Sequence, residues 1–413
     1  MWGIPIAKHF PWINSPSLHF MKPTPPKIKR IERNPIFQKA ISIPGSKSYA
    51  NRALILAALS KDPCHIKGLP KALDTLDLIA CLKRIGLQIH EGKDGLTIDR
   101  SFPSCETPSK TPIRLDSGEG GTTNRFLIPL LALGQNEYLL YPDPQVMKRP
   151  MDEFQRHIKS FEKKNDHFRI KGPQSSHSLK LGRSPTTQIA SAFSLVGYDV
   201  QIPPSLPSLP YFLMTQEMVR LFDKEFCVPP DWSSAAFPLA FAALAGSVQI
   251  ENIKAQDPLQ ADSALLGVLD QVGCDYEWNS KGLHIKKALK RPFVFDCTHS
   301  PDLFPALSFL ASYLDGESSI TGLQNLKYKE SDRLEEGIKL LSIFGIPYHL
   351  EGHTLRILGQ KPDQRARSVT TAKDHRLVMT AYLFLRLNGG GTLEPAHAVE
   401  KSFPEFFDLM GSS

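Results

Sequence analysis

Cysteine is scarce in this sequence, and it has no long hydrophobic run. Its six cysteines lie far apart and form no C-x-x-C pair, so neither a zinc site nor a dense disulfide framework is indicated. The longest apolar stretch, residues 237–245, is too short to cross a bilayer. Residues 1–20 lack the apolar core of a signal peptide. These absences favour a cytoplasmic protein that does not span a membrane.

The phosphate loop of nucleotide-binding NTPases is also missing. Residues 41–59, "ISIPGSKSYANRALILAAL", place a Gly, a Lys and a Ser between a strand-like run and a helix-like run. The NTPase loop needs Gly directly before the Lys, whereas Ser46 precedes Lys47 here, and no Gly lies five residues before Gly45. The NTPase interpretation therefore fails, and the role of this segment stays open at this point.

The chain is basic, with a formal net charge of +7 and a pI near 8.9, which indicates anionic ligands. A nucleic-acid binder would interleave aromatic residues with clustered Lys and Arg. The basic residues of this chain are instead spread over distant motifs. Small anions are therefore the favoured ligands.

The chain is long enough for two domains, and part of it repeats. Three segments share a pattern of a helix ending in Gly (Gly86, Gly273 or Gly345), a strand, a turn and a second strand. The last two of these glycines are 72 residues apart. A unit of roughly 70 residues fits the chain about six times. We therefore predict an α/β (α+β) fold of six units, divided near the Pro229–Pro230 pair.

Six junctions carry Gly, Ser, Thr or Asp just before an apolar helical run. A helix start has unpaired N–H groups and a partial positive charge, so convergent starts would form a site for a multiply charged anion. For Asp231 and Ser233, simple N-capping is a better explanation than anion binding. The junctions read "PGSKSYANRALIL", "GEGGTTNRFLIPLL", "SPTTQIASAFSLV", "PDWSSAAFPLAFAAL", "SPDLFPALSFLASYL" and "KDHRLVMTAYLFL".

Basic residues accompany Gly or Pro turns in these and neighbouring motifs. Each hydrogen bond to a charged group contributes about 1.5–3 kcal/mol, against roughly 0.3–1 kcal/mol for a helix end. Arg and Lys side chains would therefore supply most of the affinity for an anion. The residues are Lys47, Arg52, Arg125, Arg149, Arg333, Arg376 and Lys401.

Together these motifs resemble one family, the 3-phosphoshikimate 1-carboxyvinyltransferases (EPSP synthases). The resemblance rests on "PGSKSYANRAL", "GGTT", "MKRPM", "NLKYKESDRL", "KDHRLVM" and "EKSFPEFF", which occur in family order. It implies two inside-out lobes, each of three βαβαββ units, with the substrates in the cleft between them. Residues 45–230 would form the first lobe. Residues 231–413 would form the second, completed by residues 1–44, with a loosely ordered extension at about 1–25 in which Met21 is an alternative start.

The resemblance implies transfer of the enolpyruvyl group of phosphoenolpyruvate to the 5-hydroxyl of shikimate 3-phosphate, through a tetrahedral intermediate. A C–O bond breaks rather than a P–O bond, so neither a metal nor another cofactor is implied. The implied partners are the two small-molecule substrates, with no nucleic acid and no membrane. We expect a monomer.

Carried over motif by motif, the family's roles fall on three sets of residues. Asp302 would be the catalytic base and Glu330 the acid, with Lys47 an alternative proton donor. Shikimate 3-phosphate would be held by Lys47, Ser48, Arg52, Thr186, Thr187, Ser208, Tyr211, Asp302, Asn325 and Lys329. Phosphoenolpyruvate would be held by Lys47, Gly121, Arg149, Gln188, Arg333, Arg376 and Lys401. His375 is expected to be a structural or hydrogen-bonding neighbour.

The chain departs from the family pattern at a few positions, and two alternative functions stay open. Glu119 stands where Asn is common, Leu209 replaces a frequent Lys, and Thr186 and Thr187 replace two serines. These changes bear on substrate affinity more than on reaction type. The sister transferase that acts on UDP-N-acetylglucosamine typically has a Cys in the loop matching "PDPQVMKRP", which this chain lacks. A scaffold without activity is disfavoured by the intact catalytic set.

Overall fold

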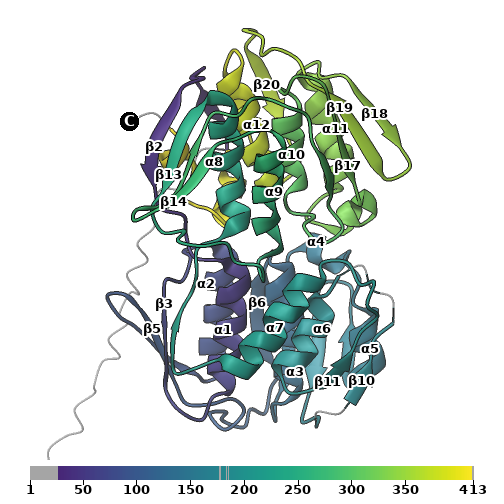
Figure 1. Ribbon diagram of the computed structural model, residues 1–413. Helices are drawn as coiled ribbons and strands as arrows, with labels where there is room; N and C mark the ends of the chain where they lie inside the picture. Colours follow the sequence, from purple (N-terminus) through teal and green to yellow (C-terminus); the bar gives the residue numbers. More distant parts are fainter. Residues whose placement is uncertain (1–26, 176–177, 183, 185, 412–413) are drawn as a thin grey trace, which may run out of the picture.

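The structure is a computed structural model that describes residues 27–175, 178–182, 184 and 186–411. The expected extension at residues 1–25, with Met21, lies outside the described residues. Two hydrophobic cores organise the chain. One gathers side chains from residues 49–228, and the other gathers side chains from residues 31–43 and 232–410. We call the parts built around these cores the first lobe and the second lobe; in Figure 1 they are the lower and the upper part.

Sheets of one repeated design form the outside of the first lobe. In both four-stranded sheets a parallel pair is extended by an antiparallel hairpin, and a short parallel pair forms a third sheet. Alternating burial, as in β7, shows that one face of the strand packs inward. The sheet orders are β12 (Glu225–Cys227), β3 (Cys64–Lys67), β5 (Gly95–Asp99), β4 (Gln88–Glu91); β6 (Ile113–Gly118), β7 (Glu137–Pro142), β9 (Phe168–Lys171), β8 (Phe161–Lys163); and β10 (Ser178–Lys180), β11 (Asp199–Gln201).

The second lobe repeats this design and includes the first strands of the described chain. Purple β2 lies in the upper lobe beside β13, with which it pairs in parallel (Figure 1). The sheet orders are β14 (Tyr276–Asn279), β15 (Gly282–Lys286), β13 (Gly246–Ile250), β2 (Phe37–Ile41); β16 (Val294–Asp296), β17 (Glu317–Thr321), β19 (Thr354–Leu358), β18 (Tyr348–Glu351); and β1 (Lys29–Ile31), β21 (Gly391–Glu394), β20 (Arg367–Thr370).

Helices fill the interior of both lobes. α8 (Trp232–Ala245) is buried on every side from Trp232 to Leu244, as expected for a helix that is apolar all round. The other central helices are α1 (Lys47–Leu59), α3 (Gly121–Ala132), α6 (Gln188–Leu195), α10 (Phe304–Ala311) and α12 (His375–Leu387). Sheets outside and helices inside confirm the predicted inside-out lobes.

Further helices pack around this centre or connect its parts. They are α2 (Leu73–Arg84), α4 (Pro144–Met147), α5 (Asp152–His157), α7 (Leu209–Leu221), α9 (Leu265–Gln271), α11 (Arg333–Ile343) and α13 (Phe406–Met410), with 3-10 helices at Ala261–Ala264, Leu323–Tyr328 and Ala396–Lys401. Within the described ranges, no helix combines the length and apolar composition needed to cross a bilayer.

The repeat found in the sequence has the expected structure. Gly86, Gly273 and Gly345 have φ values of 108°, 70° and 66°, in the left-handed region that favours glycine. Each is followed by an antiparallel hairpin: β4–β5, β14–β15 or β18–β19. The described residues form six sheets, which agrees with the predicted six units.

The chain crosses between the lobes twice, and the two crossings lie side by side. Gly45 forms a β-bridge with Pro230, and the N–H of Ser46 donates to the carbonyl oxygen of Pro229 at 2.7 Å. A Cβ on Gly45 would lie 2.0 Å from the carbonyl oxygen of Gly68. Only glycine allows this close approach.

Candidate active site

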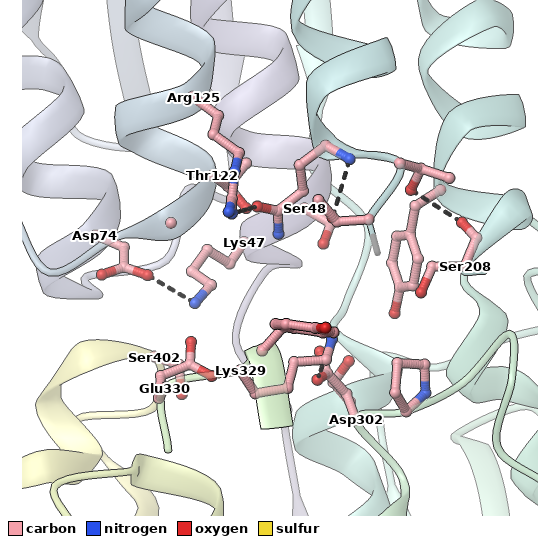
Figure 2. A pocket seen from close by; sticks show the side chains of 18 of the residues that line it. Lys47, Ser48, Asp74, Thr122, Arg125, Ser208, Asp302, Lys329, Glu330 and Ser402 are labelled. Carbon is pink, nitrogen blue, oxygen red and sulfur yellow. Dashed lines mark hydrogen bonds and ion pairs between the residues drawn. The ribbon is translucent and has the colours of Figure 1, made fainter. Parts of the chain in front are cut away.

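A cleft between the lobes collects the starts of six helices. The six junctions singled out in the sequence do begin central helices, and residues from every junction line one cavity of about 100 Å³. Figure 2 shows Lys47 and Ser48 on one side of this space and Asp302, Lys329 and Glu330 on the other. The expected convergence is confirmed. The helices begin at Lys47, Gly121, Gln188, Trp232, Phe304 and His375.

All but one of the residues assigned from the sequence line this cavity. Lys401 is the exception. It is buried behind Glu330, with its Nζ 3.6 Å from Glu330 Oε1, while its neighbour Ser402 lines the cavity. Basic side chains outnumber acidic ones, so the cavity suits a ligand with several negative charges. The assigned residues in the lining are Lys47, Ser48, Arg52, Gly121, Arg149, Thr186, Thr187, Gln188, Ser208, Tyr211, Asp302, Asn325, Lys329, Glu330, Arg333 and Arg376.

In the first lobe, the ammonium group of Lys47 is held by a buried carboxylate. Lys47 Nζ lies 2.7 Å from Asp74 Oδ2, and the Asp74 side chain is only 2% exposed. Asp74 comes from the first turn of α2, and its Oδ1 has no partner among the described residues. A ligand that binds Lys47 must share it with Asp74.

Arg52 is held in place by hydrogen bonds within the protein. Its Nε donates to Thr215 Oγ1 at 2.7 Å, and its two terminal nitrogens donate to the carbonyl oxygens of Ser48 and Tyr211, each at 2.8 Å. Burial lowers the pKa of Arg52 to about 10. Arg52 therefore also fixes the start of α1 against α7.

In the second lobe, Arg333 is the centre of an ion-pair network. It is buried at the start of α11 and donates to Asp302 at 2.5 Å, Glu330 at 2.6 Å and Asp374 at 2.7 Å. The Asp374 carboxylate also caps α12 by accepting from the backbone N–H of Arg376. This network sets the positions of both candidate catalytic carboxylates.

Both of these carboxylates stay ionised despite burial. Burial alone would raise the pKa of Asp302, but Arg376, Lys329 and Arg333 hold it well below its usual range. The pKa of Glu330 is likewise well below its usual range, because Arg333, Lys401 and Arg149 outweigh the effect of burial. Neither group holds a proton at neutral pH in this arrangement.

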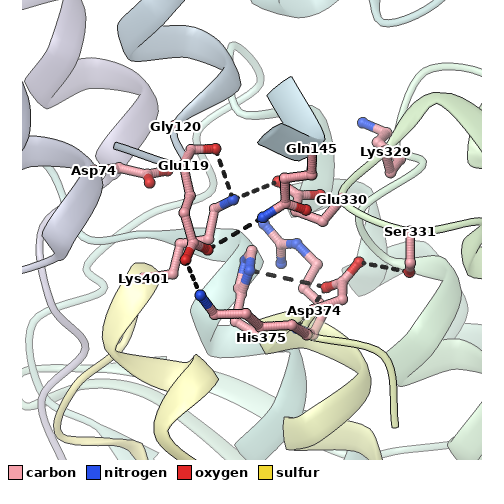
Figure 3. A network of polar contacts seen from close by, with 12 residues as sticks. Asp74, Glu119, Gly120, Gln145, Lys329, Glu330, Ser331, Asp374, His375 and Lys401 are labelled. Atoms are coloured by element: carbon pink, nitrogen blue, oxygen red, sulfur yellow. Dashed lines mark hydrogen bonds and ion pairs between the residues drawn. The ribbon is translucent and has the colours of Figure 1, made fainter. Parts of the chain in front are cut away.

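Glu119 joins the lobes at the edge of the cleft. Its carboxylate pairs with Lys373 of the second lobe and accepts from Gln145 Nε2 at 3.3 Å. Its backbone oxygen accepts from Lys401 Nζ at 3.0 Å. Figure 3 shows Glu119 between Gln145 and Lys401. The negative charge of Glu119, which stands where Asn is common in the family, is therefore neutralised by an ion pair across the cleft.

Sequence reasoning missed several polar residues here. Asp74 looks like an ordinary acidic residue in a first helical turn, and no sequence signal marks it as the partner of Lys47. Of the two residues interpreted as N-caps, Asp231 does cap α8, whereas Ser233 donates a hydrogen bond to Asp262, which the sequence had not singled out. Burial and the charge of Asp302 raise the pKa of Asp262 to about 7.

Of the two roles expected for His375, structural or hydrogen-bonding neighbour, the described residues support the structural one. His375 is 1% exposed, and neither ring nitrogen has a hydrogen-bond partner among the described residues. Burial, Lys47 and Arg376 lower the pKa of His375 well below its usual range. The imidazole is therefore neutral.

Solved structures share this architecture. EPSP synthase from Acinetobacter baumannii matches with a TM-score of 0.73 at 21% sequence identity, over 92% of this chain and 97% of that chain. The enolpyruvyl transferase NikO from Streptomyces tendae matches with a TM-score of 0.68 at 15% identity, over 93% and 96% of the two chains. These likenesses show that the chain has the fold of the enolpyruvyl transferases.

Sequence comparison then narrows the class. A family profile described as EPSP synthase (3-phosphoshikimate 1-carboxyvinyltransferase) matches residues 32–196 and 214–410. The 3-phosphoshikimate 1-carboxyvinyltransferase of Pyrococcus abyssi is 30% identical over 91% of this chain and 95% of its own length. That of Thermococcus kodakarensis is 31% identical over 89% and 95%. The chain belongs to the EPSP synthase family. It is an enzyme, and it carries out the enolpyruvyl transfer of the shikimate pathway.

Proposed function

We propose that the cleft transfers the enolpyruvyl group of phosphoenolpyruvate to the 5-hydroxyl of shikimate 3-phosphate, releasing phosphate. The observation that carries the proposal is the meeting of six helix starts and an excess of basic side chains around the carboxylates of Asp302 and Glu330. Both substrates carry several negative charges, which guanidinium groups and helix starts bind well.

Each substrate has its own part of the cleft in this proposal. Shikimate 3-phosphate lies towards the first-lobe loops, and phosphoenolpyruvate lies against Gly121 and Arg149 and reaches the second-lobe arginines. Lys47 touches both. The residues proposed to bind shikimate 3-phosphate are Lys47, Ser48, Arg52, Thr186, Thr187, Ser208, Tyr211, Asp302, Asn325 and Lys329. Those proposed to bind phosphoenolpyruvate are Lys47, Gly121, Arg149, Gln188, Arg333, Arg376 and Lys401.

The reaction proceeds by addition and then elimination. Asp302 accepts the proton of the 5-hydroxyl as its oxygen bonds to the vinyl carbon, and Glu330 gives a proton to the methylene carbon. In the second step the Glu330 carboxylate takes a proton back from the methyl group, the double bond re-forms, and the C–O bond breaks as phosphate leaves with its electron pair. Lys47 is the alternative proton donor in the first step.

The negative charge of the bound substrates makes the Asp302 and Glu330 carboxylates able to transfer protons. The phosphate and carboxylate groups of the substrates compete with Asp302 and Glu330 for Arg333 and Arg376. Loss of these partners raises the pKa of both carboxylates towards values suited to proton transfer. Proton transfer is therefore favoured when both ligands are bound.

Phosphate release tests the proposal. The wild type should release phosphate when phosphoenolpyruvate and shikimate 3-phosphate are supplied together, and should not when UDP-N-acetylglucosamine replaces the second. Lys47→Met should abolish release, whereas Lys339→Met should not, because Lys339 is an exposed residue of α11. Release with the UDP-sugar alone would assign the sister reaction instead.

Glu330→Gln tests the choice of acid. The amide keeps the shape of Glu330 but cannot donate as an acid, so turnover should fall by about a hundredfold or more at every pH. Turnover and a pH profile equal to those of the wild type would transfer the role to Lys47.

We also propose that the chain acts as a cytoplasmic monomer. Residues from both lobes of a single chain form the cavity, so the proposed reaction does not require a second copy. All six cysteines are unpaired thiols, which fits a reducing compartment. We place the lobe boundaries at residues 44/45 and 230/231, with the described residues 27–44 in the second lobe, because the two crossings pair there.

A further inference from the structure

Arg125 is a buried cation in the lining of the cleft to which the family resemblance assigned neither substrate. It lies on α3, four residues after Gly121, and its side chain is 3% exposed. In the described part of the chain, no Asp or Glu oxygen lies within 4.0 Å of its nitrogens. Burial and the charge of Arg149 lower the pKa of Arg125 to about 9. A buried charge without a counter-ion is costly, so its retention calls for a reason.

The contacts of Arg125 connect three of the sequence motifs. Its Nη1 donates to Gln188 Oε1 at 2.6 Å, and its Nη2 donates to the carbonyl oxygen of Pro150 at 3.3 Å. Pro150 follows Arg149, and Gln188 is the first residue of α6. Arg125 thus ties α3 to α6 and to the turn that carries Arg149. Figure 2 shows Arg125 beside Thr122 at the side of the cleft that holds Lys47.

This contact fixes the orientation of the Gln188 amide. A guanidinium group only donates hydrogen bonds, so the atom of Gln188 that faces Arg125 must be the oxygen. The NH₂ group then faces away from Arg125. Gln188 lines the cavity, and its Nε2 has no acceptor in the described part of the protein. Its two N–H donors are therefore available to a ligand in the cleft.

We propose that Arg125 is a positioning residue that holds the Gln188 carboxamide with its NH₂ group towards the phosphoenolpyruvate site. This inference rests on the proposed function, in which Gln188 binds phosphoenolpyruvate. Without Arg125 the amide can turn over and present its oxygen to the anion. The anion then loses a donor and meets an acceptor, which weakens its binding. Arg125 acts through Gln188 and need not touch the substrate.

A double-mutant cycle tests the inference by separate KM values for the two substrates. Arg125→Met and Gln188→Ala should each raise the KM for phosphoenolpyruvate by about tenfold or more, since a hydrogen bond to a charged group is lost. The KM for shikimate 3-phosphate should change by less than about twofold. The double variant should be no worse than Gln188→Ala, because Arg125 works through Gln188.

Two further variants cover the case in which Arg125→Met does not fold. Gln188→Glu keeps an acceptor for Arg125 but has no N–H donor and adds a negative charge, so its KM for phosphoenolpyruvate should rise at least as much as that of Gln188→Ala. Arg125→Lys keeps a donor and should restore part of the loss. The matched control is Arg220→Met, an exposed arginine of α7 that pairs with Glu217 and should change neither KM.

Several outcomes would overturn the inference. Single effects that multiply in the double variant would mean that Arg125 acts independently of Gln188. A rise in both KM values with Arg125→Met would mean a general structural role. A wild-type KM in Gln188→Glu would mean that the N–H donors are unused. In each of these cases the wild type still releases phosphate, so the proposed function stands; no release by the wild type would sink both.

Discussion

Replacing Gly121 by alanine should weaken binding of phosphoenolpyruvate specifically. An ideal Cβ at this position would lie 2.1 Å from Arg149 Nη1 and 3.3 Å from Arg125 Nη1. The Arg149 guanidinium must retreat by roughly 1 Å or more to reach ordinary contact distance. Arg149 Nη2 lies 3.7 Å from Glu330 Oε1, so a displacement of the guanidinium also alters this ion pair.

The magnitude follows from the bond that Arg149 would lose. One hydrogen bond between charged groups contributes about 1.5–3 kcal/mol, which raises the KM for phosphoenolpyruvate about ten- to a hundredfold. The KM for shikimate 3-phosphate should hardly change. The fold should also survive, because Gly121 does not have a positive φ and Ala suits a helix better than Gly.

Steady-state kinetics and urea unfolding check this prediction together. Gly267→Ala is the matched control: Gly267 lies within α9, and nothing lies within 4 Å of its ideal Cβ. That variant should keep both KM values and gain about 0.5–1 kcal/mol in the free energy of unfolding. A wild-type KM for phosphoenolpyruvate in Gly121→Ala would refute the placement of the ligand against Arg149.

Three further predictions concern pH dependence, the ion pair across the cleft and the catalytic base. Burial, Asp74 and Glu119 raise the pKa of Asp77 to about 6, so the contribution of Asp77 to the stability of the wild type falls as the pH rises from about 4 to 6. Asp77→Asn should therefore gain stability relative to the wild type at pH 7.5 but not at pH 4 in urea unfolding; an equal difference at both values would contradict this. Glu119→Lys and Lys373→Glu should each raise the KM for a substrate by less than about tenfold, because the ion pair is partly exposed. The double exchange, which re-forms the pair with its charges reversed, should restore the wild-type KM. Failure of the exchange to restore it would refute the pairing. Asp302→Asn should lower the rate constant of a single turnover by about a hundredfold or more. A smaller loss would show that Asp302 is not the catalytic base.

Local features of the fold could be predicted from the sequence. The positive φ of Gly86, Gly273 and Gly345 and the hairpins that follow depend on neighbouring residues, so spacing alone revealed them. The starts of the central helices were equally local. Their convergence was only a conditional expectation, because it depends on how the two lobes face each other.

Partnerships across the cleft could not be predicted. Glu119 and Lys373 are 254 residues apart, and no sequence pattern links them. Asp74 meets Lys47 because α1 and α2 pack together, and its burial rather than its residue type makes it unusual. The same holds for the Gln188 contact of Arg125. Tertiary packing gives these residues their roles.

The two adjacent crossings also determine the order in which the polypeptide can assemble during translation. β1 and β2 leave the ribosome before the first lobe does, yet their partners β21 and β13 are made only after the whole first lobe. Domains generally fold as units during synthesis, so the first lobe can become compact while these early strands still wait for partners. The second lobe reaches its native form only when the last segments of the polypeptide emerge.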